Sequence, residues 1–164
     1  MDKKQASITA KSIAAFRALE TEKPENERLF SDPYADELTD KEGWKLALKF
    51  TLCYPYMPKF ISVRTRYIDD FVKESIHKGI QQLIIFGAGF DTRSIRLEEL
   101  KTGIQVFEID EPYTSQEKQA KLLKIIGALP KHLSFLPIDL TKYTLEDLKE
   151  RLLEGGYNPR QKAL

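Results

Sequence analysis

Residues 82–93 read Gln-Leu-Ile-Ile-Phe-Gly-Ala-Gly-Phe-Asp-Thr-Arg and decide the fold class of this chain. The apolar run stops at a Gly-x-Gly, and a second apolar run, residues 104–110, ends in an acid about twenty residues further on. Strands that stop at glycines, with a carboxylate after the next strand, are typical of a nucleotide-type cofactor site in an open parallel sheet. The stretch therefore predicts such a site around Gly87, Gly89 and Asp110.

The rest of the chain divides into a helical part and an alternating part. Residues 1–79 are predicted to be helical, and strands at 82–86, 105–109 and 133–140 then alternate with helices. Strands separated by helices imply right-handed crossovers and a parallel sheet. The expected fold class is α/β: a helical region followed by the first half of a Rossmann-like sheet. Residues 1–79 would act as a lid or cap on residues 80–164, within one structural domain.

The longest predicted helix covers residues 58–77 and ends at Gly79, a residue suited to a helix C-terminus. Its apolar residues recur at helical spacing, and the pattern predicts that they face inward. These residues are Phe60, Val63, Tyr67, Phe71 and Val72.

The glycine pattern departs from the dinucleotide fingerprint, because Thr92 stands where the third glycine is expected. In NAD and FAD sites that glycine permits the tight packing that presents a helix N-terminus to the pyrophosphate. A ligand without a pyrophosphate, such as S-adenosylmethionine, fits better, and Asp110 would accept both ribose hydroxyls. An alternative is that Gly87 and Gly89 only form a tight turn and Asp110 caps the next helix.

Composition limits the other function classes. The net charge is +1 over 164 residues, so no basic surface points to nucleic acid or to an anionic membrane. The single cysteine, Cys53, argues against a disulfide framework or a multi-cysteine metal site, and its apolar neighbours predict core packing. With no signal-like start and no long apolar run, a soluble cytoplasmic protein without a metal is expected.

Several motifs together resemble one known family. In chain order they are Ser31-Asp-Pro-Tyr-Ala35, Arg64-Thr-Arg-Tyr-Ile-Asp-Asp70, Gly87-Ala-Gly-Phe-Asp-Thr-Arg93, Val106-Phe-Glu-Ile-Asp-Glu-Pro112 and Ile138-Asp-Leu140. The chain resembles the leucine carboxyl methyltransferase family, in particular its bacterial and archaeal branch of S-adenosylmethionine-dependent methyltransferases. The resemblance covers nearly the whole chain and implies S-adenosyl-L-methionine as cofactor.

The resemblance also implies roles for individual residues. Arg64 is similar to the arginine that holds the methionine carboxylate, which suits a guanidinium fork. Gly87, in the motif with Gly89, corresponds to the glycine whose main chain meets the amino-acid part of the cofactor, and Asp110 matches the ribose-binding acid. A further group of cofactor-binding residues is implied: Asp139 and Leu140 as the pair that reads adenine, and Arg17 as a basic residue near the cofactor carboxylate.

Other polar residues are interpreted as structural. Glu108 shares a strand face with Asp110, and an acid buried there needs a cationic partner. The candidate partners are Arg66, Arg93 and Arg96.

The remaining polar residues are predicted to stabilise helix ends or to face solvent. Asp91 and Thr92 are expected to cap the helix after the first strand, while His77 and His132 are expected to be solvated. One of Asp69 and Asp70 is expected to face solvent or to bond to Arg66.

No general base is evident, and the catalytic residues stay unknown. The cofactor carries an activated methyl group, so a carboxylate acceptor, as the family name implies, needs alignment and exclusion of water rather than deprotonation. That acceptor would belong to a small molecule or to a protein C-terminus. A hydroxyl acceptor would require a base.

The family continues the sheet beyond residue 159, whereas this chain ends at Leu164, where the next strand is expected to begin. With the spatial order 3-2-1, the first strand would lie at an open apolar edge, which favours self-association. We therefore expect an N-terminal fragment of an O-methyltransferase. The alternative is a catalytically silent remnant that serves as a cofactor-binding or oligomerisation module. An NAD-type oxidoreductase is disfavoured by Thr92 and by the missing half of the sheet.

Overall fold

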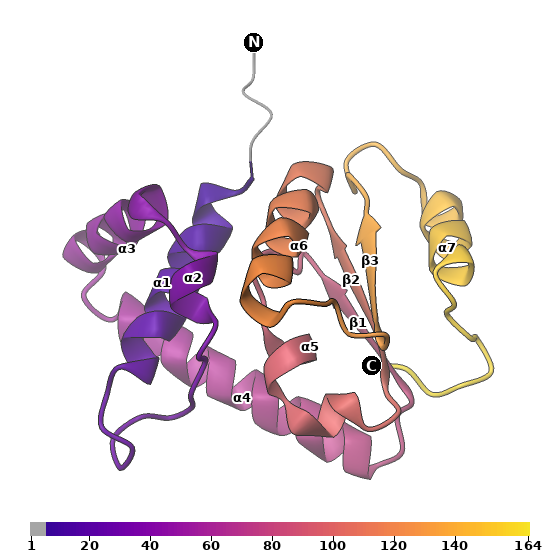
Figure 1. Ribbon diagram of the computed structural model, residues 1–164, viewed down its shortest axis with the longest axis horizontal. Helices are drawn as coiled ribbons and strands as arrows, with labels where there is room; N and C mark the ends of the chain where they lie inside the picture. Colours follow the sequence, from indigo (N-terminus) through magenta and orange to yellow (C-terminus); the bar gives the residue numbers. More distant parts are fainter. Residues whose placement is uncertain (1–5) are drawn as a thin grey trace.

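The structure, a computed structural model, describes residues 6–164 and has a mixed helix-and-sheet fold (Figure 1). The helices are α1 (Ile8–Thr21), α2 (Ala35–Leu38), α3 (Lys41–Cys53), α4 (Met57–His77), α5 (Arg93–Arg96), a 3₁₀ helix η1 (Glu98–Lys101), α6 (Pro112–Ile126) and α7 (Leu145–Glu154). The strands are β1 (Gln82–Phe86), β2 (Gln105–Asp110) and β3 (Leu133–Pro137). The predicted α/β fold class is confirmed, and α1 to α4 occupy the part of the chain that was expected to be helical.

Local signals place the helix ends. Ser7 caps α1 by accepting a hydrogen bond from the N–H of Ala10, and Asp40 caps α3 by accepting one from Gly43. Such caps satisfy N–H groups that have no partner inside the helix. After α4 the chain passes through Gly79 with a φ of 86°, a conformation that glycine adopts without steric cost.

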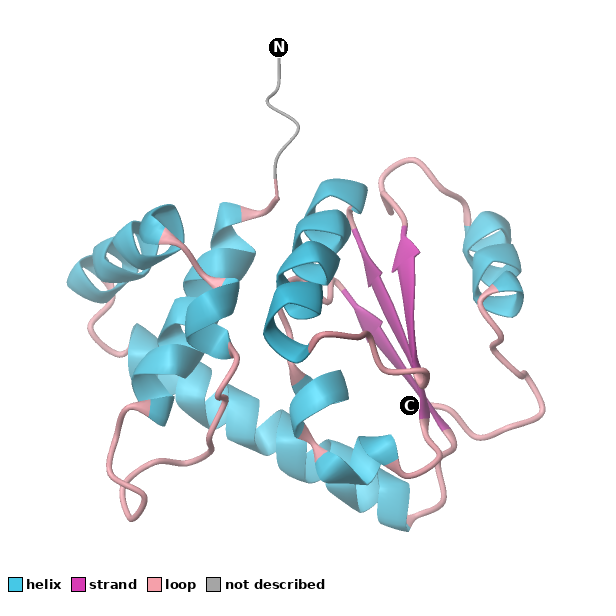
Figure 2. Ribbon diagram, viewed as in Figure 1, coloured by secondary structure: helices cyan, strands magenta, loops and turns pink. Residues whose placement is uncertain are grey.

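The three strands form a parallel sheet in the order β1-β2-β3 (Figure 2). Leu83 pairs with Val106 and Val106 with Leu133, so the carboxyl ends of all three strands lie at one edge. That edge is at the top of Figure 1, where α6 begins. Ligands of open parallel sheets bind outside this edge.

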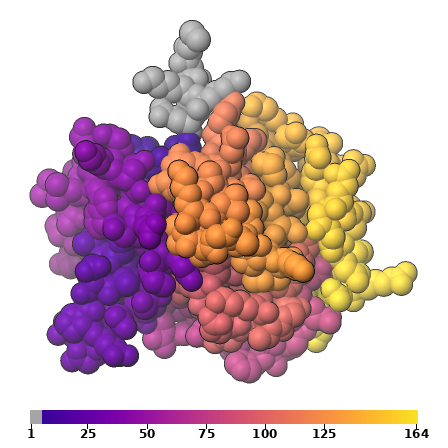
Figure 3. Space-filling model, in the orientation of Figure 1, coloured from indigo at the N-terminus to yellow at the C-terminus, as the bar shows by residue number. Residues whose placement is uncertain are grey.

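Helices cover both faces of the sheet. On one face, Leu122 of α6 and Val72 of α4 join the core formed with Val106 and Leu133. Successive residues of a strand point to opposite faces, so Phe107 packs on the other side, in a second core that includes Leu152 of α7. In Figure 3 the atoms of α6 hide much of the sheet from the viewer. None of the helices in residues 6–164 carries an apolar stretch long enough to cross a bilayer.

The edge of the sheet at β1 is partly covered, which corrects the expectation of an open edge. Residues 162–164 run parallel to β1: the N–H of Gln82 donates to Lys162 O, and the N–H of Ile84 donates to Leu164 O at 2.9 Å. The buried amide of Gln82 fixes the segment further by bonding to the backbone of Asn158 in both directions. Only the second half of β1 therefore remains open.

The inward face predicted for α4 is wrong except at Val72. Phe60, Val63, Tyr67 and Phe71 are all at least 47% exposed, whereas Val72 is 3% exposed. The buried face of α4 instead carries Ser62, Thr65 and Asp69, beside Ile61 and Val72. Helical periodicity identifies an apolar face, but it does not say which neighbour covers that face.

Cys53 is exposed, so the prediction that it packs in the core is also wrong. It is the last residue of α3, and Leu52 beside it is 75% exposed. The core side of α3 is made by small residues, Gly43 and Ala47, because α3 lies very close to α1. A Cβ on Gly43 would come within 2.8 Å of Lys11 Cβ.

Candidate functional site

A polar cavity of about 160 Å³ lies at the carboxyl end of β1. Its walls come from three segments that are far apart in sequence. α1 contributes Ala10 and Arg17, α4 contributes Arg64 and Thr65, and the loop from residue 87 to 93 forms the rest. The cavity therefore joins the helical region to the glycine motif.

The two glycines of the motif serve different purposes. Gly87 has a φ of 62° and Gly89 a φ of 51°, and both values disfavour any residue with a side chain. A Cβ on Gly87 would meet nothing within 4 Å, so its backbone faces free space in which a ligand can approach. A Cβ on Gly89 would lie 2.9 Å from Ala10 Cβ, so Gly89 permits the close packing of α1 on the loop.

Arg17 of α1 and Arg64 of α4, two of the arginines that line the cavity, also differ. Arg17 is 6% exposed and is held in place: its Nε donates to Asp32 at 2.7 Å and its Nη2 to Phe90 O at 2.6 Å. Arg64 is exposed and makes no hydrogen bond or ion pair within residues 6–164. A guanidinium without a partner beside a polar cavity is available to bind an anion, a carboxylate above all.

Asp110 lies beside the glycine loop at the end of β2. One carboxylate oxygen accepts the N–H of Gly89 at 2.5 Å, and the other accepts the N–H of Glu111 at 2.7 Å. Each carboxylate oxygen has two acceptor sites, so both keep one for a further donor. The carboxylate thus fixes the loop and still has the capacity to bind hydroxyls. The alternative prediction, that Asp110 caps the next helix, is wrong, because the N-cap of α6 is the neighbouring Glu111.

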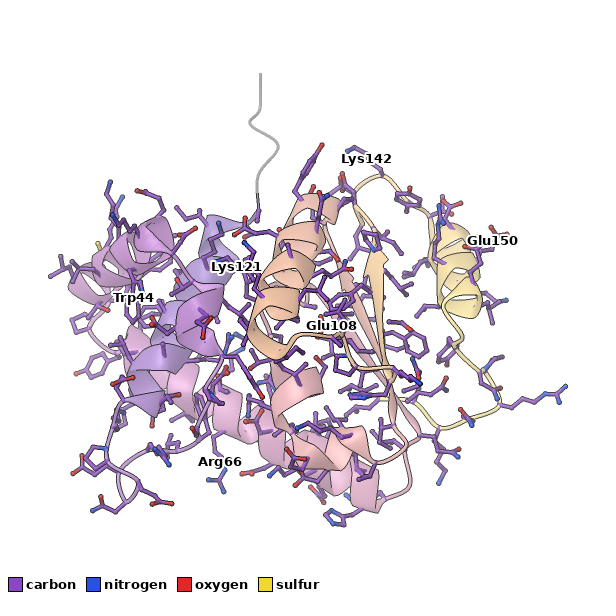
Figure 4. All side chains as sticks on the ribbon, viewed as in Figure 1. Trp44, Arg66, Glu108, Lys121, Lys142 and Glu150 are labelled. Atoms are coloured by element: carbon purple, nitrogen blue, oxygen red, sulfur yellow. The ribbon has the colours of Figure 1, made fainter. Side chains whose placement is uncertain are left out.

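Asp139 and Leu140 lie after β3 and do not line this cavity. The carboxylate of Asp139 is engaged locally, by Lys142 at 2.5 Å and by the hydroxyl of Thr141 at 2.6 Å. The hydrogen bond from Lys142, followed by those from Thr141, lowers the pKa of Asp139 to about 2. Figure 4 shows Lys142 on the loop between β3 and α7. The adenine role of this pair stays a prediction, at the far end of the same sheet edge.

A network of buried ion pairs supports the cavity from behind. Asp32 accepts hydrogen bonds from Arg17 and from the hydroxyl of Thr92 at 2.6 Å. Asp69 of α4 accepts from both Arg93 and Arg96, each at 2.7 Å. These contacts tie α1, α4 and the glycine motif together. Within the described part of the chain, no buried side-chain nitrogen or oxygen lacks a hydrogen-bond partner.

The expected caps at Asp91 and Thr92 are only partly correct. Asp91 accepts the N–H of Arg93 at 2.8 Å, but Thr92 makes no capping bond, since its hydroxyl is committed to Asp32. Asp91 also lines the cavity and forms an ion pair with the Arg93 side chain. Burial alone would raise the pKa of Asp91, yet the charges of Arg93 and Arg17 outweigh burial and hold the pKa below its ordinary value.

Glu108 is a buried structural acid, as expected, but its partner was not among the three arginines considered. Its carboxylate accepts hydrogen bonds from Lys118 of α6 at 2.5 Å and from Ser94 at 2.7 Å. Burial raises the pKa of Glu108 despite the opposing charge of Lys118. Figure 4 places Glu108 between the sheet and α6. The pairing arises because α6 folds back over β2.

Of the remaining predictions for polar residues, some are confirmed and one is wrong. Arg66 forms an exposed ion pair with Asp70 at 2.7 Å, whereas the neighbouring Asp69 is buried in the network. His77 is exposed, as expected. His132 is half-buried, with Nε2 2.9 Å from Ser94 O, so solvation is the wrong description for it.

Comparison with known proteins assigns this architecture to a family. The family model of leucine carboxyl methyltransferase matches residues 10–164, which include the cavity and the whole sheet. The chain belongs to the leucine carboxyl methyltransferase family. The family resemblance seen in the sequence motifs is therefore confirmed.

Proteins with similar sequences come from several bacteria. A Mycolicibacterium smegmatis protein is 32% identical over 165 residues, covering 93% of this chain and 53% of the relative. A Bacillus subtilis protein is 40% identical over 94 residues, covering 57% of this chain and 30% of the relative. Both are named "Putative S-adenosyl-L-methionine-dependent methyltransferase". The chain spans about half the length of the M. smegmatis relative.

Proposed function

We propose that this chain is the cofactor-binding half of an S-adenosylmethionine-dependent O-methyltransferase. The observation that carries the proposal is the unpaired guanidinium of Arg64 at a cavity whose other wall is the open backbone of Gly87. A cation and free main-chain groups at the carboxyl end of β1 fit the amino-acid end of this cofactor. The names of the relatives support the same choice.

In this proposal different residues bind different parts of the cofactor. Arg64 binds the methionine carboxylate, and Arg17 contributes positive charge while Asp32 holds it in position. Gly87 and Gly89 let the backbone come close, and Asp110 accepts the ribose hydroxyls with the acceptor capacity that its two backbone bonds leave. Asp139 and Leu140 take the adenine end. When bound, the cofactor supplies an activated methyl group on a sulfonium.

The acceptor in this proposal is a carboxylate oxygen, on a small molecule or at a protein C-terminus. Among residues 6–164, Asp91 is the one carboxylate that lines the cavity. It is paired with Arg93, and its lowered pKa makes it a weak base toward a hydroxyl group. An acceptor that is already an anion needs no base, so the chain's task is to align it and to exclude water. A hydroxyl acceptor would need a base from elsewhere.

The part of the reaction that we assign to this chain depends on how much of its relatives' length it matches. It corresponds to about half of the M. smegmatis relative, so we propose that it is an N-terminal fragment and that residues binding the acceptor belong to the other half. The alternative is a catalytically silent remnant that serves as a cofactor-binding or oligomerisation module. Only the first transfers a methyl group when the second half is supplied.

Calorimetric titration with S-adenosylhomocysteine tests the binding step. We expect Arg64→Ala to weaken binding by about 1.5–3 kcal/mol, roughly tenfold or more, because a charged hydrogen bond is lost. The matched control is Arg66→Ala, two residues along the same helix, whose exposed side chain pairs with Asp70 and donates to Leu29 O, outside the cavity (Figure 4). Absence of saturable heat with folded protein would reject the proposal, and so would equal losses in the two variants.

A further inference from the structure

Asp91 lines the polar cavity at the carboxyl end of β1 as a negative group among positive ones. The charged side chains on the cavity walls are those of Arg17, Arg64, Arg93 and Asp91. Arg17 and Arg93 are already paired with buried acids, Asp32 and Asp69. Arg64 makes no ion pair in the described part of the chain. Within residues 6–164 the cavity therefore offers a ligand one uncommitted cation and one carboxylate.

The carboxylate of Asp91 keeps room for a further donor. One oxygen accepts the N–H of Arg93 at 2.8 Å, and the other accepts a hydrogen bond from the guanidinium of the same residue. A carboxylate oxygen has two acceptor sites, so each oxygen keeps one. The side chain is 17% exposed, which leaves part of it open to whatever occupies the cavity. Asp91 can therefore pair with Arg93 and bind a second cation at the same time.

The position of Asp91 is fixed through its two neighbours in the loop. Before it, Arg17 Nη2 donates to Phe90 O at 2.6 Å. After it, the hydroxyl of Thr92 donates to the buried Asp32 at 2.6 Å. Because these bonds hold the loop on both sides, the carboxylate stands at the cavity wall before any ligand binds. A group that is already in place costs little to order when the ligand arrives.

We propose that Asp91 binds the α-ammonium group of the cofactor, while Arg64 binds the carboxylate on the same carbon atom. This inference rests on the proposed function, which assigns the amino-acid end of the cofactor to this cavity. An amino acid carries one positive and one negative group. The cavity presents the opposite charge to each of them from a different segment, α4 for Arg64 and the glycine loop for Asp91. Asp91 would then select ligands that carry an amino group.

The charge of Asp91 favours the ammonium over the other groups that the reaction brings together. Burial opposes that charge, but Arg93 and Arg17 outweigh burial and hold the pKa of Asp91 below its ordinary value. An anion at this wall repels the carboxylate of the proposed acceptor and attracts a cation. The sulfonium of the cofactor is a cation without an N–H to donate, whereas an ammonium has three. The free acceptor sites of Asp91 therefore suit the ammonium.

Calorimetric titration with two ligands tests this assignment: S-adenosylhomocysteine, and its analogue in which hydrogen replaces the α-amino group. Neither carries a sulfonium, so the two differ only at the ammonium. We expect the parent chain to bind S-adenosylhomocysteine about tenfold or more tightly than the analogue. In Asp91→Asn the two affinities should become nearly equal. A purely structural Asp91 would weaken both ligands alike and leave their ratio unchanged, and that result would overturn the inference.

Three further variants control the comparison. Asp70→Asn, at an exposed acid that pairs with Arg66 outside the cavity, should keep the preference of the parent chain. Arg64→Ala should weaken both ligands and keep the preference, since both ligands retain the carboxylate. Asp91→Ser removes the charge but keeps an oxygen that can accept the N–H of Arg93. It replaces Asp91→Asn if that variant does not fold, and it should lose the preference in the same way.

The outcomes separate this inference from the proposed function. A parent chain that binds both ligands equally well would overturn the role of Asp91 and leave the proposed function standing. A folded parent chain that binds neither ligand would reject the proposed function and this inference with it.

Discussion

The two faces of α4 are opposite in character, and the polar one is buried. The inner face presents Thr65 and Asp69 to the arginines of the glycine motif, and Asp69 is 3% exposed. The outer face presents Phe60 and Tyr67 to solvent, each at least 60% exposed. Polar groups are buried where each has a partner, and apolar groups are exposed where residues 6–164 supply nothing to cover them. The four predictions below test that contrast, beginning with the largest effect.

Removal of Asp69 should be the most damaging change. Asp69→Ala leaves the guanidinium groups of Arg93 and Arg96 buried without this partner, and we expect a loss of about 3–5 kcal/mol in the free energy of unfolding. Asp70→Ala, at the next residue, removes only an exposed ion pair with Arg66 and should cost at most about 1 kcal/mol. Urea denaturation of the two variants measures the difference. Similar losses would show that the inner face of α4 does not depend on its ion pairs.

The buried pair of Glu108 and Lys118 should give a pH-dependent effect. Lys118→Met leaves the Glu108 carboxylate without its cation, and we expect a loss of about 2–3 kcal/mol at neutral pH. The pKa of Glu108 is already raised in the folded chain, and the variant raises it further.

A raised acid pKa means that the folded state binds the proton more tightly than the unfolded state does. The contribution of Glu108 to stability is therefore complete below its unfolded pKa of about 4.3 and is lost as the pH rises through the folded pKa. The variant should approach the parent chain at acid pH and fall behind it as the pH increases. Denaturation curves at several pH values measure this, and a pH-independent deficit would contradict it.

The stability cost of replacing the two glycines at the cavity should depend on how closely each is surrounded. Gly89→Ala combines a positive φ with a contact of 2.9 Å to Ala10 Cβ, and should cost about 2–3 kcal/mol. Gly87→Ala has the φ penalty alone, in open space, and should cost about 1–2 kcal/mol. Thermal unfolding followed by circular dichroism gives the order. A larger cost at Gly87 would mean that α1 does not pack on the loop.

Substitutions on the outer face of α4 should have the smallest effect on the isolated chain. Tyr67→Ser removes apolar surface that no part of residues 6–164 covers well, so the free energy of unfolding should stay within about 0.5 kcal/mol of the parent. Thr65→Val on the inner face serves as the matched comparison, two residues away and 5% exposed. A clear loss of unfolding free energy in Tyr67→Ser would show that the outer face of α4 is already covered in the free protein.

Much of the fold was predictable because it depends on local signals. The apolar runs ending at Gly87 and Asp110 identify β1 and β2, and the local caps at Ser7 and Asp40 start α1 and α3. The burial of Glu108 follows from its place in a strand with helices on both sides. Each of these features needs only a few neighbouring residues, which is why the sequence alone reveals them.

The candidate site was predictable in its members but not in its grouping. Arg17, Arg64, Gly87 and Gly89 do meet at one cavity, with Asp110 bonded to the loop, whereas Asp139 and Leu140 lie apart from it. Asp91 was interpreted as a cap and turns out to line the cavity. No spacing rule relates residue 17 to residue 91, and only the packing of α1 on the loop brings them together.

The sequence by itself determined the order of helices and strands, the turn glycines and the family, because these depend on residue types at short spacing. Only the tertiary structure decided which face of α4 is buried, which cation pairs with Glu108 and how residues 162–164 cover half of β1. Those outcomes depend on contacts between segments that are distant in sequence. Several residues of the same chemical type could make each contact, and the packing of the segments decides which one does. A periodic sequence pattern carries no information about that packing.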